Sequence, residues 1–477
     1  MRLSPLLAVA AVAAGSLALA HPASAAPTGW DADNGTVSVA GGVASTVTVQ
    51  PGWSLTTAPA SPAVPGRVYT GSYEAQAGAV GRQVVPYLYF YDSAGNVLDK
   101  VKGATTADTT SVWTSSGTVV ALAPAKAVSV SVGSLTWGSL AGEAHRVRAV
   151  ALGSKAVTAT DVVGPLRTVG NQVYDARGPI VLKGVNRVGF ENSPTGRNTS
   201  SDDVAAAKRW GATMVRVPLS SAYWLSSNCN YSAGYSALVD SFVSSITSRG
   251  MVALLDLHTN TLGTCGGGVT QKPMADTTAV DFWTQAATRY KDNPLVAFEL
   301  YNEPHDISDA VWLSGGTATF NGTSYAVVGM QKLYDTVRAT GATNLVFVNG
   351  TSWASTPTSR FVTGTNIVHG VHAYTCPVAV DATCAPNPLQ APPSLSQWVV
   401  PAQTTPVVVT EFGWPSVGSA TYNANVIALL ASRGWGWAAF SLDGSTSGAF
   451  SLVSTAGAGA SYQPSVSGMP VLTALAG

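Results

Sequence analysis

Residues 293–306 read NPLVAFELYNEPHD, and this stretch decides how the C-terminal part of the chain folds. The apolar run PLVAF is typical of a strand buried on both faces, and it leads into two glutamates, Glu299 and Glu303. The whole chain of 477 residues contains only six glutamates. Pro304 restricts Glu303 to extended backbone angles. We therefore expect a carboxylate held in one direction at the end of a buried strand.

The same pattern repeats over residues 166–477, where short apolar runs alternate with stretches of helical period. The strand-like runs include VLKGVN, TMVRVPL, MVALLDL and PVVVTEF, and eight can be counted, most of them followed by a helix. Such an alternation predicts an α/β fold, the (β/α)8 TIM barrel. A doubly wound open sheet is the alternative. Such a sheet would be expected to have a glycine-rich, phosphate-binding turn after an early strand, and the sequence has none.

Residues 26–160 follow a different pattern, with the period of two that is typical of strands. Segments such as YLYFYDSAGNVL and AVSVSVGSLTW alternate apolar and small polar residues. They predict an all-β sandwich of jelly-roll type in front of the barrel. This domain would be a carbohydrate-binding module or a structural spacer. The aromatic residues that could line a sugar groove are Trp53, Trp113, Trp137 and Tyr73.

Composition and the N-terminus indicate an exported globular protein. The chain is 46% hydrophobic and 10% charged, and its formal net charge is zero, which gives no electrostatic footprint for nucleic acid or an anionic membrane. Residues 1–25 resemble a secretory signal, with Arg2, an apolar run and a small-residue cleavage site ending at Ala25. A membrane anchor is the alternative, but the apolar run is short and is interrupted by His21 and Pro22. We expect a secreted, extracellular monomer.

Polar residues follow six of the eight predicted strands. A barrel carries its functional groups at the carboxyl ends of its strands. In chain order these residues are Asn186, Arg216, Asp256 with His258, Asn302 with Glu303, His372 with Tyr374, and Glu411. Their recurrence at one face of the barrel is hard to attribute to packing alone.

Two of these residues, Glu303 and Glu411, should face each other across the barrel mouth. Glycosidic cleavage needs one protonated carboxyl group for the leaving oxygen and one carboxylate that attacks the anomeric carbon or activates water. The two environments must differ for both roles to coexist at one pH. Arg216 near Glu411 would keep that carboxylate ionised. Glu299 lies deeper in its strand, and we interpret it as a paired structural carboxylate.

The motifs LKGVN, VRVPL, LDLH, ELYNEPHD, VHAYT and VVVTEFGWPS together resemble glycoside hydrolase family 5, the cellulase family. The likeness covers about residues 166–475 and suggests a secreted bacterial type. It implies retaining hydrolysis of a β-linked polysaccharide, with Glu303 as general acid/base and Glu411 as nucleophile. The supporting residues that the family implies are Arg216, His258, Asn302, His372 and Tyr374.

The end of the eighth predicted strand departs from the family pattern. The family usually has a tryptophan there as a sugar platform, whereas WAAFSLDG places Phe440 at that position. A shift of register would instead bring Trp437 or Trp435 to it. We expect Asn186, Phe440, Trp437 and Trp414 to contact substrate.

Four cysteines, Cys229, Cys265, Cys376 and Cys384, allow three pairings in an exported protein. We favour Cys376–Cys384, which closes a short loop, and Cys229–Cys265, which joins the loops after strands 2 and 3. A zinc site is the alternative, but no CxxC is present and no histidine lies at ligand spacing. We expect neither a metal nor a cofactor.

Three functions are consistent with this sequence. The first is a retaining endo-β-1,4-glucanase that acts on cellulose-like polysaccharide. The second is a β-mannanase, or another β-glycanase with the same catalytic groups. The third, a non-catalytic polysaccharide-binding protein, is disfavoured because both carboxylates are present. No nucleic-acid partner is expected, and no membrane partner once the signal is cleaved.

Overall fold

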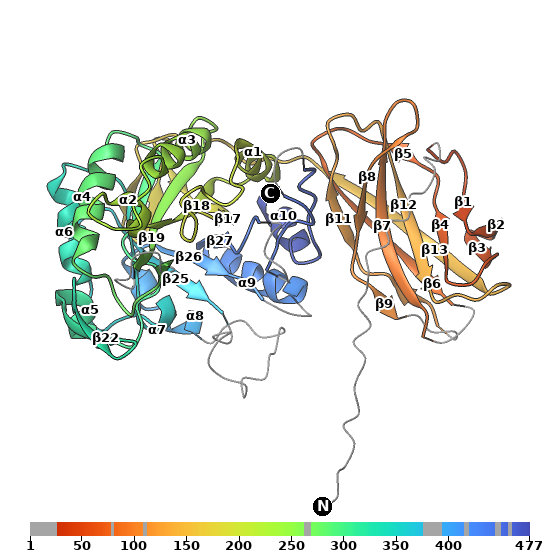
Figure 1. Cartoon of the computed structure of the whole chain (residues 1–477). Helices are drawn as coiled ribbons and strands as arrows, with labels where there is room; N and C mark the ends of the chain where they lie inside the picture. The colour runs from red at the N-terminus through yellow and green to blue at the C-terminus, as the bar shows by residue number, and fades with distance from the viewer. Residues whose placement is uncertain are drawn as a thin grey trace, which may run out of the picture.

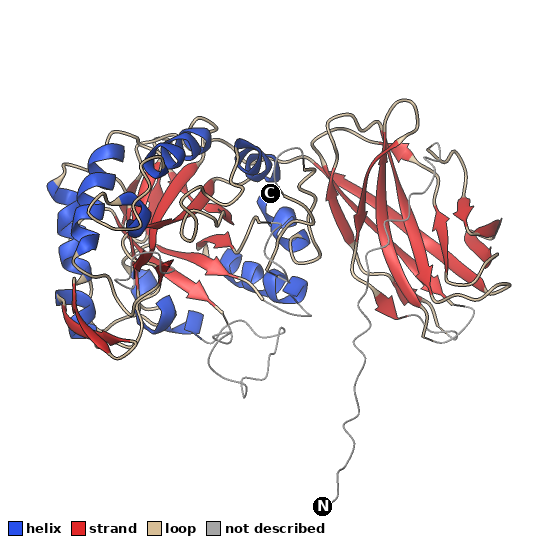
Figure 2. Cartoon of the chain, in the orientation of Figure 1, coloured by secondary structure: helices blue, strands red, loops and turns tan. Residues whose placement is uncertain are grey.

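The computed structural model describes residues 26–77, 81–107, 112–261, 269–374, 394–414, 419–443, 450–456 and 460–477. These residues form an antiparallel β-sandwich followed by a parallel barrel with helices around it (Figure 1, Figure 2). The predicted signal segment, residues 1–25, lies outside the described residues. Within the described ranges, no helix is both long enough and apolar enough to cross a bilayer.

Two antiparallel sheets make up the sandwich. The first runs in the order β1 (Asp31–Asp33), β4 (Trp53–Thr57), β12 (Ser129–Trp137), β7 (Gln83–Tyr91) and β8 (Val97–Lys102), with β5 (Ser61–Pro62) and β9 (Thr106–Ala107) beside it. The second runs β10 (Thr114–Ser115), β6 (Val68–Gln76), β13 (Ala144–Lys155), β3 (Val43–Thr48) and β2 (Gly35–Ala40), with β11 (Val119–Leu122) on β6. A Cβ at Gly71 of β6 would lie 3.0 Å from Leu88 and 3.1 Å from Val132 of the first sheet. The sheets therefore pack closely on one apolar core.

Eight parallel strands form the barrel. They are β17 (Lys183–Asn186), β18 (Met214–Ser220), β19 (Val252–Thr261), β21 (Val296–Glu299), β24 (Val346–Asn349), β25 (Ile367–Ala373), β26 (Val407–Phe412) and β27 (Gly436–Ala439). Strand β17 pairs with both β18 and β27, which closes the ring. All residues of β18 and β26 are buried, as expected for strands packed on both faces. The predicted TIM barrel is confirmed, and the open sheet is excluded.

Helices connect most of the barrel strands. They are α1 (Ser201–Trp210), α2 (Ser221–Trp224), α3 (Tyr235–Thr247), α4 (Thr278–Tyr290), α5 (Asp309–Ser314), α6 (Met330–Ala339), α7 (Thr351–Ala354), α8 (Ser394–Gln397), the 3-10 turn η1 (Pro401–Gln403), α9 (Ser419–Arg433) and α10 (Met469–Leu475). Helix α1 begins with a capping box between Ser200 and Asp203 and ends at Gly211, whose φ is 96°. The short strand β20 (Val269–Thr270) and the hairpin β22 (Gly316–Phe320) and β23 (Thr323–Val327) complete the connections.

A short antiparallel sheet closes the amino-terminal end of the barrel. It consists of β14 (Arg167–Val169), β15 (Gln172–Tyr174) and β16 (Pro179–Ile180). Val173 belongs to the same buried apolar cluster as residues from the barrel interior, among them Leu254 and Phe347. The segment LRTVGNQVYDARGPI therefore closes the bottom of the barrel.

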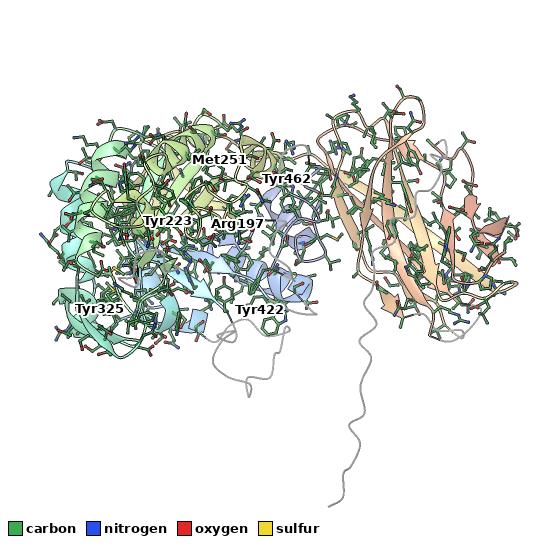
Figure 3. The ribbon with its side chains drawn as sticks, viewed as in Figure 1. Arg197, Tyr223, Met251, Tyr325, Tyr422 and Tyr462 are labelled. Atoms are coloured by element: carbon green, nitrogen blue, oxygen red, sulfur yellow. The ribbon has the colours of Figure 1, made fainter. Side chains whose placement is uncertain are left out.

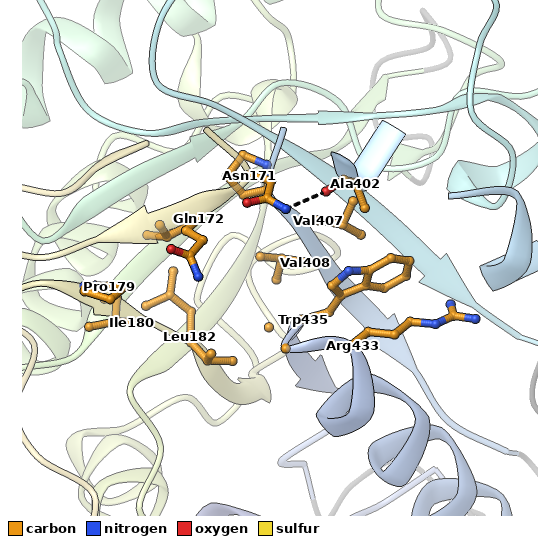
Figure 4. Close-up of a pocket in the computed structure, with 15 residues that line it drawn as sticks. Asn171, Gln172, Pro179, Ile180, Leu182, Ala402, Val407, Val408, Arg433 and Trp435 are labelled. Carbon is orange, nitrogen blue, oxygen red and sulfur yellow. Dashed lines mark hydrogen bonds between the residues drawn. The ribbon is translucent and has the colours of Figure 1, made fainter. Parts of the chain in front are cut away.

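A cavity of about 350 Å³ lies between this short sheet and strands β26 and β27. Figure 4 shows it, with Trp435 and Arg433 on one side and Asn171 donating a hydrogen bond to the carbonyl of Ala402 at 3.0 Å. The guanidinium of Arg433 lies over the Trp435 ring at 4.8 Å. The cavity is at the amino ends of the strands. It is thus at the opposite end of the barrel from the predicted site.

The sandwich contacts the barrel directly, near helices α9 and α10 (Figure 1). Gln463 is buried, and its side chain accepts a hydrogen bond from the backbone N–H of Leu122 at 3.1 Å. It also donates to the Leu122 carbonyl at 2.7 Å and to Asp99 at 2.9 Å. Nearby, Tyr462, labelled in Figure 3, donates to Asp203 of α1 at 2.6 Å. One short segment of the barrel therefore binds both the sandwich and α1.

Candidate active site

Arg216 of β18 lies at the centre of the predicted site and is completely buried. Its guanidinium forms ion pairs with Glu299 at 2.6 Å, with Asp256 at 2.9 Å and with Glu411. Burial alone would lower the pKa of Arg216, but the three carboxylates raise it well above its usual range. This arginine is therefore a fixed positive charge beneath the barrel mouth.

The carboxyl groups of Glu303 and Glu411 lie close together, as predicted. An oxygen of each lies within 4.8 Å of an oxygen of the other. Their surroundings differ, because the Glu303 side chain is 18% exposed and that of Glu411 is 6% exposed. Glu411 accepts hydrogen bonds from Arg216 and, at 2.9 Å, from the hydroxyl of Tyr374. Glu303 lies at the solvent side of the pair.

Positive charge around Glu411 keeps it ionised. Burial by itself would raise the pKa of this carboxyl group. The charges of His372, Arg216 and His258, together with the hydrogen bond from Tyr374, hold the pKa below its usual value. Glu411 is therefore available as a carboxylate at neutral and mildly acidic pH.

His372 lies between the two carboxyl groups. Its Nδ1 is 2.8 Å from Glu303 and 3.6 Å from Glu411, while its Nε2 is 3.9 Å from Glu299, too far for a hydrogen bond. Burial would lower the pKa of this imidazole, but the surrounding carboxylates raise it to about 10. His372 therefore carries a proton that it donates to Glu303. A protonated histidine is unsuited to a metal, so the cluster of Glu303, His372 and Glu411 carries no metal assignment.

His258 and Asn302 form the third side of the site. His258 Nδ1 lies 2.7 Å from Asp256, and its Nε2 lies 3.3 Å from the amide nitrogen of Asn302. Burial raises the pKa of Asp256 to about 6 although Arg216 opposes this, and the carboxylate of Asp256 raises the pKa of His258. The structure thus brings Arg216, His258, Asn302, His372 and Tyr374 together around the two glutamates.

Asn186 was expected to contact substrate, but it is completely buried. Its amide donates to the carbonyls of Thr410 at 2.9 Å and Ala438 at 3.1 Å, and its oxygen accepts from Arg216 at 3.0 Å. These bonds occupy the side chain inside the barrel. The prediction of substrate contact is wrong, because Asn186 instead holds Arg216 in place.

Of the three aromatic residues that were expected to contact substrate, one is half-buried and two are buried. Phe440 is half-buried at the end of β27, edge-on to Phe450 with ring centroids 5.8 Å apart. Trp437 is only 1% exposed and packs on Phe412 inside the barrel wall. Trp414 is 4% exposed and lies against Tyr422 of α9. Substrate contact is therefore contradicted for Trp437 and Trp414, whereas Phe440 stays in position for it.

Two features near the site were missed from the sequence. Gln271 lies beside β20 and bonds both Asn302 and the backbone carbonyl of Glu303. Trp353 is 38% exposed, and its ring stacks on His305 at a centroid distance of 3.6 Å and an angle of 7°. Nothing in their local sequence singles them out, because neither belongs to a charged pair or a periodic pattern.

Only one of the four cysteines belongs to the described residues. Cys229 takes part in a disulfide. Cys265, Cys376 and Cys384 lie outside the described residues. The pairings Cys229–Cys265 and Cys376–Cys384 therefore stay predictions.

A closed parallel barrel with two facing carboxyl groups at its carboxyl end is the arrangement of a glycoside hydrolase. Residues 175–446 match the family Cellulase (glycosyl hydrolase family 5). Because this match spans more than half of the sequence, the chain belongs to glycosyl hydrolase family 5.

Two curated relatives are endoglucanases from fungi. The chain is 27% identical over 274 residues to Endoglucanase 1 of Saitozyma flava, a match that covers 53% of this chain and 76% of the relative. It is 24% identical over 279 residues to Endoglucanase EG-II of Hypocrea jecorina, covering 52% of this chain and 63% of the relative. These relatives lend no support to the expected bacterial type.

A solved structure supports the fold. The catalytic domain of Thermobifida fusca endoglucanase Cel5A superposes with a TM-score of 0.50 and 19% identity, covering 66% of this chain and 98% of that chain. At this identity the likeness concerns the barrel alone.

Proposed function

We propose that this family 5 hydrolase is an endo-β-1,4-glucanase that retains anomeric configuration by double displacement. The observation that carries the proposal is the separation of Glu303 and Glu411, whose nearest carboxyl oxygens are within 4.8 Å. Retaining enzymes place their carboxyl groups about 5–5.5 Å apart, whereas inverting enzymes leave about 6.5–9.5 Å for a water molecule. The names of the fungal relatives support a glucan as the substrate.

The first step transfers the sugar to the enzyme. Glu411, ionised and held by Arg216 and Tyr374, attacks the anomeric carbon, and the bond to the leaving oxygen breaks. Glu303 in its acid form gives its proton to that oxygen. The products of this step are a glycosyl ester on Glu411, a free chain end and an ionised Glu303.

The second step returns the enzyme to its starting state. Glu303, now a carboxylate, takes a proton from a water molecule whose oxygen attacks the anomeric carbon. The ester bond to Glu411 breaks, and the carboxylate returns to Arg216 and Tyr374. The imidazolium of His372, 2.8 Å from Glu303, stabilises the negative charge that Glu303 carries between the two steps.

The test compares Glu411→Gln and Glu303→Gln with the wild-type chain, with Glu74→Gln of the sandwich as the matched control. Hydrolysis of carboxymethylcellulose is expected to fall by about 10³-fold or more in Glu411→Gln, while binding to the polysaccharide is kept. Proton NMR of the first products should show the β-anomer. Wild-type turnover in Glu411→Gln would overturn the assignment, and an α-anomer as the first product would overturn retention.

The choice of polysaccharide is tested separately. Reducing-sugar release is measured on carboxymethylcellulose, lichenan, mannan and laminarin. The proposal expects carboxymethylcellulose and lichenan to be cleaved faster than the other two. Preference for mannan would make the chain a β-mannanase with the same carboxyl groups. Binding without any release would make it a polysaccharide-binding protein.

We also propose that the protein is secreted after removal of residues 1–25, on the basis of the signal-like N-terminus. N-terminal sequencing of the protein from the culture medium should begin at Ala26. A mature protein that retains residues 1–25 would contradict this.

A further inference from the structure

The segment that carries Glu303 runs beyond the regular barrel sheet. Strand β21 ends at Glu299, so residues 300–305 need other partners. The backbone N–H groups of Leu300 and Asn302 still donate to Phe347 of β24 and to Leu257 of β19. Further partners come from residues 271–273, just after β20. The hydroxyl of Tyr301 donates to the Lys272 carbonyl at 2.7 Å, and the backbone N–H of His305 donates to the Pro273 carbonyl at 2.9 Å. Residues 271–273 therefore form a strap alongside the segment of the acid/base.

Gln271 is the member of this strap that reaches the reacting groups. Its Nε2 donates to the backbone carbonyl of Glu303 at 2.6 Å, and its Oε1 accepts from Asn302 Nδ2 at 2.7 Å. The Glu303 carbonyl receives a second hydrogen bond from His305 Nδ1 at 2.8 Å. One side chain thus joins Glu303, the acid/base of the proposed mechanism, to Asn302, one of the supporting residues around the two glutamates.

Arg216 and the backbone carbonyl of Glu303 lie at the two ends of this chain of hydrogen bonds, and their chemistry fixes its direction. Arg216 can only donate, and it donates to Asn302 Oδ1 at 2.7 Å. A backbone carbonyl can only accept, so Gln271 must face Glu303 with its NH₂ group. The amide oxygen of Gln271 then faces the NH₂ group of Asn302. A flipped amide at either position would oppose two acceptors or two donors, so both amides have a single orientation.

We propose that Gln271 is a positioning residue that aligns Glu303 and Asn302 for the reaction. It fixes the peptide from which the Glu303 side chain projects, and it holds the amide of Asn302, whose nitrogen also lies 3.3 Å from His258 Nε2. Gln271 does not touch the reacting bond, so it acts only through these two residues. The inference rests on the proposed function, because it assigns Gln271 to the alignment of the acid/base of that mechanism.

Two substitutions separate the bonds from the shape of the side chain. Gln271→Glu keeps the shape but replaces the donor to the Glu303 carbonyl with an acceptor. Gln271→Met keeps the length and removes both bonds. Lys272→Met is the control in the same strap, because the backbone carbonyl of Lys272 that holds Tyr301 is unchanged. Thermal unfolding of all variants shows whether the fold is kept.

The measurement compares kcat/KM for two substrates that differ in their leaving group. With phenyl β-cellobioside, which needs a proton donor, we expect kcat/KM to fall about 10- to 100-fold in both Gln271 variants. With 2,4-dinitrophenyl β-cellobioside, whose leaving group needs little protonation, the loss should be much smaller. Glu303→Gln serves as the reference for complete loss of the acid. Lys272→Met should behave as wild type with both substrates.

The outcomes distinguish this inference from the proposed function. If the wild-type chain cleaves neither glycoside, the proposed function fails. If the wild type is active and both folded Gln271 variants match it, the positioning role is wrong. Equal losses with the two glycosides would also overturn the role toward Glu303, because a loss of alignment in the acid must depend on the leaving group.

Discussion

Single hydrogen bonds to Glu411, the proposed nucleophile, should affect the pH range over which the enzyme is active. Of the groups that lower the pKa of Glu411, Tyr374 is the one that acts through a neutral hydrogen bond, whereas His372, Arg216 and His258 act through their charge when protonated. Its hydroxyl donates to Glu411 at 2.9 Å. A hydrogen bond to the ionised form of a carboxyl group favours that form. The acid side of the pH profile should therefore depend on this hydroxyl.

Tyr374→Phe is expected to move the low-pH limb of kcat/KM toward higher pH. Removing the bond destabilises the carboxylate, so the pKa of Glu411 rises and more of the enzyme is inactive at a given acidic pH. The expected displacement is less than about one pH unit, because the cations remain. Tyr231→Phe, at an exposed tyrosine, is the control for the profile measured on an aryl β-cellobioside. A limb that stays in place or moves to lower pH would contradict the role.

The sequence predicts which residues meet better than it predicts what they touch. Arg216, His372 and Glu411 could be placed together because the carboxyl ends of parallel strands share one face of a barrel. The same argument placed Asn186 against substrate, although its side chain points into the closed interior. Position along a strand does not say whether a polar group lies above or below the layer of Arg216. That difference depends on the tilt and register of the strands, which no local pattern records.

The turn after β24 presents an aromatic ring at the mouth of the barrel. Ser352, Trp353 and Ala354 of α7 have φ values of 53°, 60° and 57°, a left-handed conformation that costs roughly 1–2 kcal/mol per residue. The backbone N–H of Trp353 donates to the Pro304 carbonyl at 3.0 Å. Strain of this kind is found where function requires it. The exposed ring therefore lies beside the segment that carries Glu303. Because the proposed acid protonates the leaving oxygen, we expect the ring to face the leaving side of the substrate.

Trp353→Ala is expected to weaken binding of the sugar units on the leaving side of the cleaved bond. Cleavage of cellopentaose should fall roughly tenfold in kcat/KM, which corresponds to the loss of one stacking contact of about 1.4 kcal/mol. Hydrolysis of an aryl β-cellobioside, which has no sugar on the leaving side, should change little. Trp137→Ala is the matched control, because Trp137 has the same 38% exposure but belongs to the sandwich. Equal losses with both substrates would place the ring elsewhere in the mechanism.

Elements with their own local signals were predictable, and this turn was not. Helix α1 has its capping box and its terminal glycine in the sequence, and the eight barrel strands each have an apolar run. Residues 351–354 contain no glycine or asparagine that would indicate a left-handed turn. The strap at residues 271–273 is likewise defined by its partners across space. Such elements are determined by contacts in the folded barrel, so the local sequence does not predict them.

At the level of the whole molecule, the change of pattern near residue 160 marks where the sandwich ends but not how it is attached. The aromatic set proposed for sugar binding is mixed in the structure. Tyr73 is buried in the core, and Trp113 lies 4.2 Å beneath the guanidinium of Arg148. Trp53 and Trp137 are cross-strand partners on one sheet. Carbohydrate binding by the sandwich stays a prediction, whereas its contact with the barrel is a feature of the fold.

Gln463 makes that contact specific, and its substitution tests whether the sandwich braces the barrel. Gln463→Ala removes the partners of both the N–H and the carbonyl of Leu122. A buried group left without a partner costs about 1–3 kcal/mol, so the free energy of unfolding should fall by about 2–4 kcal/mol. Gln285→Ala, at an exposed position on α4, is the control in differential scanning calorimetry. If the two parts support each other, the wild type unfolds in one transition that Gln463→Ala lowers or splits. Two independent transitions in the wild type, unmoved by the substitution, would show that the sandwich is merely tethered.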